Sequence, residues 1–147
     1  MLLNARELPP SFHFRKDLHM STGKLLAQLG HCAEGFWTRA LVCVAHRDGD
    51  VYRCQVDIPA GVFDGYVAGS FVKTVCEARN KNHLLKAKAI AKEMKLIENV
   101  DFGLIYDNCR TELTPEGPDG TTLTGILFRP LPDEEAHKIS KKYQLYR

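Results

Sequence analysis

Three polar residues in the first quarter of the chain are spaced to lie on one face of a helix. Lys24, Gln28 and His31 fall within about 60° of one another when each residue turns the helix by about 100°. Lys24 also lies in the predicted first turn, where free N–H groups and the helix dipole favour anions over cations. A lysine there has a purpose if an anionic group binds beside it. The alternative is a solvated helix face with an ordinary surface lysine.

A carboxylate follows a short apolar run in the second half of the chain. Asp107 comes directly after Leu104-Ile105-Tyr106. Open α/β sheets place ligand-binding groups at the carboxyl ends of buried strands, so Asp107 is a candidate for chemistry. Asp-Asn is also good turn chemistry, and Asp107 could simply accept hydrogen bonds from nearby backbone N–H groups. These residues alone leave both interpretations open.

Both regions resemble signatures of the archaeal and eukaryotic type of peptidyl-tRNA hydrolase, the type 2 family. Residues 15–31 match R-x-D-L-x-M-x-x-G-K-x-x-A-Q-x-x-H, and residues 107–115 match D-x-x-x-T-[EQ]-[IL]-x-P. Gly125-Ile126 and the ending Tyr143-Gln144-Leu145-Tyr146 also fit. The resemblance covers residues 11–33 and 71–147.

The resemblance is weakest over residues 38–70, an insertion-like segment where the family usually has a helix and a shorter connection. Asn108-Cys109 stands where the family has Ala-Gly. Residues 128–135 look more like the peptidyl-tRNA hydrolase domain-containing proteins, relatives that lose the lysine and the aspartate–threonine pair. This chain keeps Lys24, Asp107 and Thr111, which favours an active enzyme.

The resemblance implies a hydrolase that cleaves the ester between a peptide and the 3′-terminal ribose of tRNA, and it implies a homodimer. Its catalytic group would be Lys24, Gln28, Asp107 and Thr111, with water oriented or deprotonated by Asp107 and charge stabilised by Lys24. His31 has the spacing to join them, and a helix histidine without a catalytic role is an equal alternative. The rival function is a non-catalytic RNA- or protein-binding relative that keeps the fold.

Composition narrows the other possibilities. The 147 residues are 44% hydrophobic and 26% charged, which is ordinary for a globular protein, and a net charge of +2 does not by itself indicate a nucleic-acid partner. Five cysteines without a C-x-x-C pair predict neither a disulfide framework nor a zinc site. We expect no metal, no cofactor and no membrane segment, and a cytoplasmic location. Cys32 and Cys54 are expected in the core.

Contact with RNA requires basic residues on one surface. The candidates lie on a predicted helix in the third quarter of the chain and near the C-terminus, and the alternative is a solvated helix face. They are Lys88, Lys92, Lys95, Lys141 and Lys142.

The hydrophobic periodicity predicts a single three-layer α/β domain over residues 1–147, with a mixed sheet of about four strands and helices on both faces. One helix begins at Ser21 or Thr22 with an apolar stripe, one begins after Asn80, and one lies near the C-terminus. Asp48-Gly49 predicts a hairpin, and residues 60–70 a loop with one helical turn. Strands are expected at residues 11–15, 41–45, 51–58, 71–78, 102–106 and 122–128, and the outer two helices at 80–96 and 133–142.

Overall fold

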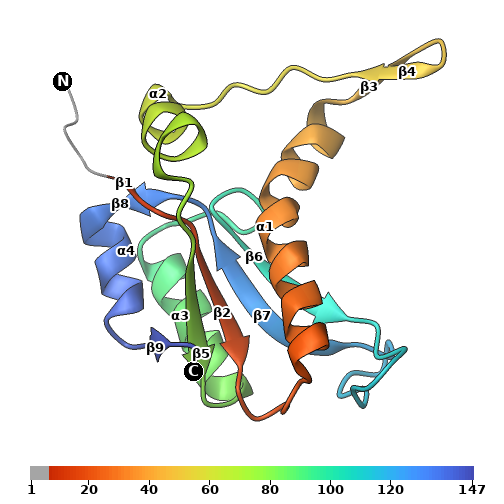
Figure 1. The fold of residues 1–147 in the computed structure, drawn as a ribbon, viewed down its shortest axis with the longest axis vertical. Coiled ribbons are helices and arrows are strands. Elements are labelled where there is room, and N and C mark those ends of the chain that lie inside the picture. The colour runs from red at the N-terminus through yellow and green to blue at the C-terminus, as the bar shows by residue number, and fades with distance from the viewer. Residues whose placement is uncertain (1–6) are drawn as a thin grey trace.

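A mixed five-stranded sheet forms the centre of the computed structural model, which describes residues 7–147 (Figure 1). β2 runs parallel to β5, and all other neighbours in this sheet are antiparallel. Because β6 and β2 both oppose β7, the carboxyl ends of β2, β5 and β6 lie at the same end of the sheet. The strand order is β6 (Phe102–Asp107), β7 (Thr122–Phe128), β2 (Ser11–Arg15), β5 (Thr74–Ala78) and β9 (Gln144–Leu145).

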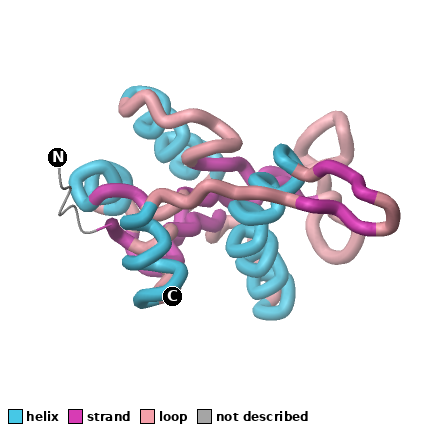
Figure 2. Tube along the Cα trace, turned by 90° about the horizontal axis from the view of Figure 1, so that it is seen from above, coloured by secondary structure: helices cyan, strands magenta, loops and turns pink. Residues whose placement is uncertain are grey.

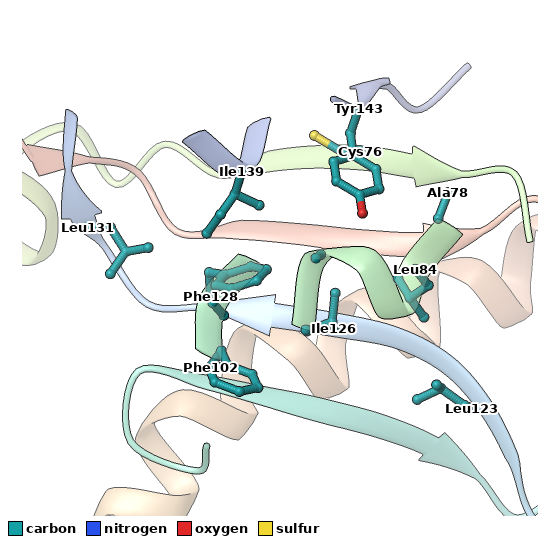
Figure 3. Close-up of a cluster of buried hydrophobic side chains, with 12 residues drawn as sticks. Cys76, Ala78, Leu84, Phe102, Leu123, Ile126, Phe128, Leu131, Ile139 and Tyr143 are labelled. Atoms are coloured by element: carbon teal, nitrogen blue, oxygen red, sulfur yellow. The ribbon is translucent and has the colours of Figure 1, made fainter. Parts of the chain in front are cut away.

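Helices cover both faces of the sheet, which confirms the mixed α/β fold expected from the sequence (Figures 1 and 2). On one face, α1 (Thr22–Val44) packs through Cys32 and its apolar stripe against Phe12 and Phe14 of β2. On the other face, α3 (Lys81–Glu93) and α4 (Asp133–Ser140) enclose a larger apolar cluster (Figure 3). Alternation along the strands supplies both cores, since successive side chains point to opposite faces.

Both predicted helix caps are present. Ser21 caps α1, and its hydroxyl accepts a hydrogen bond from the Lys24 amide at 3.3 Å. Asn80 caps α3 by accepting one from the His83 amide at 2.9 Å. These short polar side chains satisfy N–H groups that the helix itself leaves free.

Residues 38–70 differ from the prediction. The strand expected at 41–45 is wrong because α1 continues to Val44, and Trp37, Ala40 and Val44 keep the helical spacing and line one hollow. The hairpin around Asp48-Gly49 is confirmed by β3 (His46–Asp48) and β4 (Val51–Arg53), with Gly49 at φ 61° in the turn. It projects away from the main sheet, and its second strand covers three residues rather than the predicted 51–58 (Figures 1 and 2).

The prediction that Cys54 lies in the core is wrong, because Cys54 follows the projecting hairpin and is exposed. Cys32 is buried as predicted. Residues 60–70 are also more helical than the expected single turn. They form α2 (Ala60–Val62) followed by a π-helical segment (Phe63–Ser70). A separate short pair joins β1 (Glu7–Leu8) to β8 (Leu131–Pro132). Within the described residues, no helix has the length and apolarity to cross a membrane.

Candidate active site

The fold brings the first turns of α1 against the carboxyl end of β6. The Lys24 Nζ atom lies 2.6 Å from Asp107 Oδ2, and Gln28 donates a hydrogen bond to the same oxygen at 2.9 Å. Lys24 and Gln28 are one helical turn apart, so both side chains reach the carboxylate from one face of the helix. The expected juxtaposition of Lys24 and Asp107, 83 positions apart in the sequence, is therefore present.

Thr111 completes the group from the loop after β6. Its hydroxyl oxygen accepts a hydrogen bond from Lys24 Nζ at 3.1 Å. The other oxygen of Asp107, Oδ1, accepts one from the Cys109 amide at 2.8 Å. Cys109 has a φ of 54°, which turns the chain back so that its N–H faces the carboxylate. Asp107 therefore both accepts a hydrogen bond within its own turn and pairs with Lys24.

Burial and hydrogen bonding act in opposite directions on the Asp107 carboxyl. Burial raises its pKa, because a low-dielectric surrounding disfavours the charged form. The hydrogen bond from Lys24, the Cys109 amide and the positive charge of Lys24 outweigh burial, so the pKa lies below its ordinary value. The side chain is only 9% exposed. Asp107 is therefore held as a carboxylate that is largely protected from bulk water.

A buried threonine fixes the orientation of Gln28. Thr124 donates its hydroxyl proton to Gln28 Oε1 at 2.6 Å, and both side chains are buried. With the amide oxygen engaged by Thr124, the amide nitrogen is directed at Asp107. Thr124 therefore acts on the carboxylate through Gln28.

Thr124 was not predicted as a site residue, because it reaches α1 through a β-bulge. Ile105 pairs with Gly125, and the next residue, Tyr106, pairs with Leu123, which leaves Thr124 as the extra residue of β7. A bulge lets consecutive residues face the same side of a sheet. A Cβ at Gly125 would lie 2.7 Å from Phe14 Cδ1, so a glycine is required beside the bulge. That strand glycine is the signal from which a bulge could have been inferred.

Arginine and carboxylate contacts anchor the loop that follows Asp107. Arg15 is 3% exposed and pairs with Glu116 through two hydrogen bonds of 2.7 and 2.8 Å. It also pairs with Asp17 at 2.7 Å and donates to the Leu123 carbonyl. Glu112 accepts a hydrogen bond from the Ser21 hydroxyl at 2.9 Å. The loop is thus attached to β2 and to the start of α1, which carries Lys24 and Gln28.

The remaining candidates lie outside this group. His31 is exposed one turn beyond Gln28, and its side chain forms no hydrogen bond among the described residues. Lys88 forms an ion pair with Glu98 at 3.1 Å, whereas Lys92 and Lys95 are exposed on or just after α3. Lys141 and Lys142 are exposed near β9. In the described part of the chain, no three His, Cys, Asp or Glu side chains are grouped to hold a metal ion.

Comparisons with known proteins extend the sequence resemblance. The family model described as peptidyl-tRNA hydrolase PTH2 matches residues 11–146. A solved structure of an Agrobacterium tumefaciens protein of unknown function aligns over 95% of this chain and 97% of its own, with a TM-score of 0.53 and 15% identity. At that identity the similarity shows a common fold. No curated protein matches the chain.

Proposed function

This chain belongs to the peptidyl-tRNA hydrolase PTH2 family, and from that premise we propose that it hydrolyses the ester joining a peptide, or an N-blocked amino acid, to tRNA. The observation that carries the proposal is the convergence of Lys24, Gln28 and Thr111 with the buried Asp107 carboxylate. Ester hydrolysis needs an oriented water, a donor for the oxyanion and a proton for the leaving oxygen. This group supplies each of them.

Asp107 is the residue that we assign to water. It accepts a proton from water as the water oxygen adds to the ester carbonyl carbon. The resulting tetrahedral intermediate then breaks its bond to the ribose oxygen, and Asp107 returns the proton to that oxygen. The products are a peptide carboxylic acid, which ionises, and tRNA with a free hydroxyl. The lowered pKa keeps Asp107 ionised at neutral pH, at the cost of a weaker base.

Lys24 is the donor that we assign to the oxyanion. An ammonium group has three protons, and two of them are directed to Asp107 and Thr111. The third is left for the carbonyl oxygen as it becomes negative, or for a phosphate of the tRNA. A positively charged donor held in place before the reaction stabilises developing charge without reorganisation.

Thr111 and Gln28 orient the other participants. The Thr111 oxygen accepts from Lys24, so its own proton is free to donate to water or to the ester. Gln28 holds the reacting carboxylate from the buried side. The His31 side chain forms no hydrogen bond or ion pair with this group in the described residues, and we assign no chemical step to it.

The wider biological role follows from the same reaction. Cleavage would release tRNA from peptidyl-tRNA for further translation, including peptidyl-tRNA left on stalled ribosomes, in the cytoplasm and without a metal or cofactor. Lys88, Lys92, Lys95, Lys141 and Lys142 are our candidates for phosphate contacts. The family resemblance also suggests a homodimer, which light scattering of the purified protein would test.

The decisive experiment is release of a labelled N-acetyl amino acid from tRNA by the purified protein. Activity is expected in the presence of a chelator and is expected to be lost in Asp107→Asn, with a folded variant verified by its circular dichroism. Arg47→Gln, on the distant hairpin, is a matched surface control that should retain activity. If the wild-type protein binds tRNA but releases no amino acid, the chain is a non-catalytic RNA-binding relative.

A further inference from the structure

A basic hollow lies at the end of β5, at the edge of the sheet that β9 forms. It has a volume of about 360 Å³ and lies away from the Lys24–Asp107 group. Its lining comes from the end of β5, the first turn of α3 and the segment that leads into β9. The lining residues are Glu77, Arg79, His83, Lys141, Lys142, Tyr143 and Gln144.

The charges of this hollow are unevenly balanced. Its carboxylate, Glu77, is already engaged by Lys16 at 3.2 Å and by the Gln144 amide at 2.6 Å. The hydrogen bond from Lys16 is the main reason that the pKa of Glu77 is lowered. Arg79, Lys141 and Lys142 form no ion pair with a carboxylate in the part of the chain that the structure describes. Three cations therefore share a hollow whose one carboxylate already has a partner.

The floor of the hollow is rigid. The Nδ1 atom of His83 accepts a hydrogen bond from the Arg79 amide at 3.1 Å, so this nitrogen is unprotonated and the ring is neutral. The ring stacks on Tyr143 with centroids 4.5 Å apart, and the Tyr143 hydroxyl donates to the His83 carbonyl at 2.6 Å. These contacts fix the backbone at Arg79 and join α3 to the segment before β9.

The hollow and the candidate active site lie at the same end of the sheet. β5 and β6 are separated by β7 and β2, so three strand spacings of about 4.8 Å place their carboxyl ends about 14 Å apart. Figure 1 shows β2 ending, and α1 beginning, at this end. An extended anionic ligand can therefore reach the hollow while its terminus lies at Asp107.

We propose that this hollow binds a backbone phosphate of the tRNA whose 3′ end lies at Asp107. The proposal rests on the proposed function and adds a second binding site to it. Arg79 presents a planar fork of donors to phosphate oxygens, and Lys141 and Lys142 add positive charge. Each phosphate neutralised by such groups releases counterions, so its contribution to binding depends on salt.

The test is equilibrium binding of deacylated tRNA at several salt concentrations, which requires no turnover. The double variant Arg79→Gln/Lys142→Gln is expected to raise Kd about tenfold and to reduce the slope of log Kd against log salt by about one. Arg47→Gln/Arg53→Gln removes the same number of charges from the hairpin and is expected to bind like the wild type.

Three outcomes would overturn the proposed phosphate site. They are wild-type affinity and salt slope in the Arg79→Gln/Lys142→Gln variant, an equal loss of affinity in the hairpin control, and no binding of tRNA by the wild type.

A second measurement compares kcat/KM for N-acetyl-aminoacyl-tRNA with that for the corresponding N-acetyl-aminoacyl nucleoside. The ratio should fall in the hollow variant, because the nucleoside lacks the distant phosphate. If the wild type binds tRNA in a salt-dependent manner but hydrolyses no substrate, the result would contradict the proposed function and leave the phosphate site intact.

Discussion

The hydroxyl of Thr124 lies 2.6 Å from Gln28 Oε1, and this contact determines which end of the Gln28 amide faces Asp107. Removing the hydroxyl leaves a buried carbonyl oxygen without its donor, at a cost of about 1–3 kcal/mol in folding stability. The amide is then free to rotate. The carboxylate loses a fixed partner while all groups that contact substrate remain in the chain.

Thr124→Val should therefore lower kcat by about threefold to tenfold with little change in KM. Valine keeps the shape of threonine but has no hydroxyl. Thr124→Ser is the matched control, since it restores the donor and should recover most of the activity. If Thr124 has only a structural role, Thr124→Val should lose stability in thermal melting and denaturant unfolding while its kcat stays at the wild-type value.

Asp107→Asn and Lys24→Ala test the two central residues. Asparagine serves as well as aspartate in a turn, so a turn former would tolerate the change. A residue that handles water should lose about 100-fold or more in kcat. Lys24→Ala should cost a similar factor, and the double variant less than the product of the two losses, because groups that act together are not additive. Near-wild-type turnover by folded Asp107→Asn would contradict the catalytic assignment.

The lowered pKa of Asp107 predicts the acid limb of the pH–rate profile. The carboxylate stays ionised until the pH falls through its folded-state pKa, which lies below the ordinary value of 3.8. In Lys24→Met the hydrogen bond and the charge are lost while burial remains, so this pKa should rise and the acid limb of kcat/KM should move to higher pH. Lys24→Arg keeps the charge and should keep the limb near its original position. An unchanged limb in Lys24→Met would mean that another group titrates.

His13 predicts how stability depends on pH. Burial is the main cause that lowers the His13 pKa from 6.5 to about 3, and the nearby His83 adds to it. The folded state therefore excludes a proton that the unfolded chain binds below pH 6.5, so stability is full above that pH and is lost as the pH falls toward 3. The loss at pH 5 should be about 2 kcal/mol. Denaturant unfolding of His13→Leu should show a smaller difference between pH 7.5 and pH 5 than the wild type does.

The lysines on and just after α3 should differ in their effect on tRNA binding. Lys88 is paired with Glu98, whereas Lys92 is exposed without a carboxylate partner in the described residues. Lys92→Gln and Lys95→Gln should therefore raise KM and flatten its salt dependence more than Lys88→Gln does. Steady-state kinetics between 50 and 200 mM salt, on the order of the range where phosphate contacts weaken strongly, would measure this. Equal salt slopes in all three variants and the wild type would mean that these lysines form a solvated surface and do not contact tRNA phosphates.

Local sequence marked the starts of two helices and pointed to residues that converge in the structure. Ser21 and Asn80 mark the starts of two helices because their side chains satisfy free N–H groups of the first turn. The stripe through Cys32 faces the sheet as its spacing predicts. Lys24, Gln28 and Asp107 could be identified from the sequence because the spacing of each motif can be read without knowledge of the fold that brings the motifs together.

Only the tertiary structure decided what local patterns leave ambiguous. The apolar run after Ala40 fits either a strand or a helix, and in the structure it continues α1. Trp37, Ala40 and Val44 there line a hollow together with residues from distant parts of the chain. Thr124 reaches Gln28 only through the register of β6 against β7, and a bulge in that pairing depends on both strands. The basic hollow joins residues 77–83 to 141–144 because β9 pairs with β5. Periodicity records which face of an element is apolar, whereas the partner of that face is determined by the folding of the whole chain.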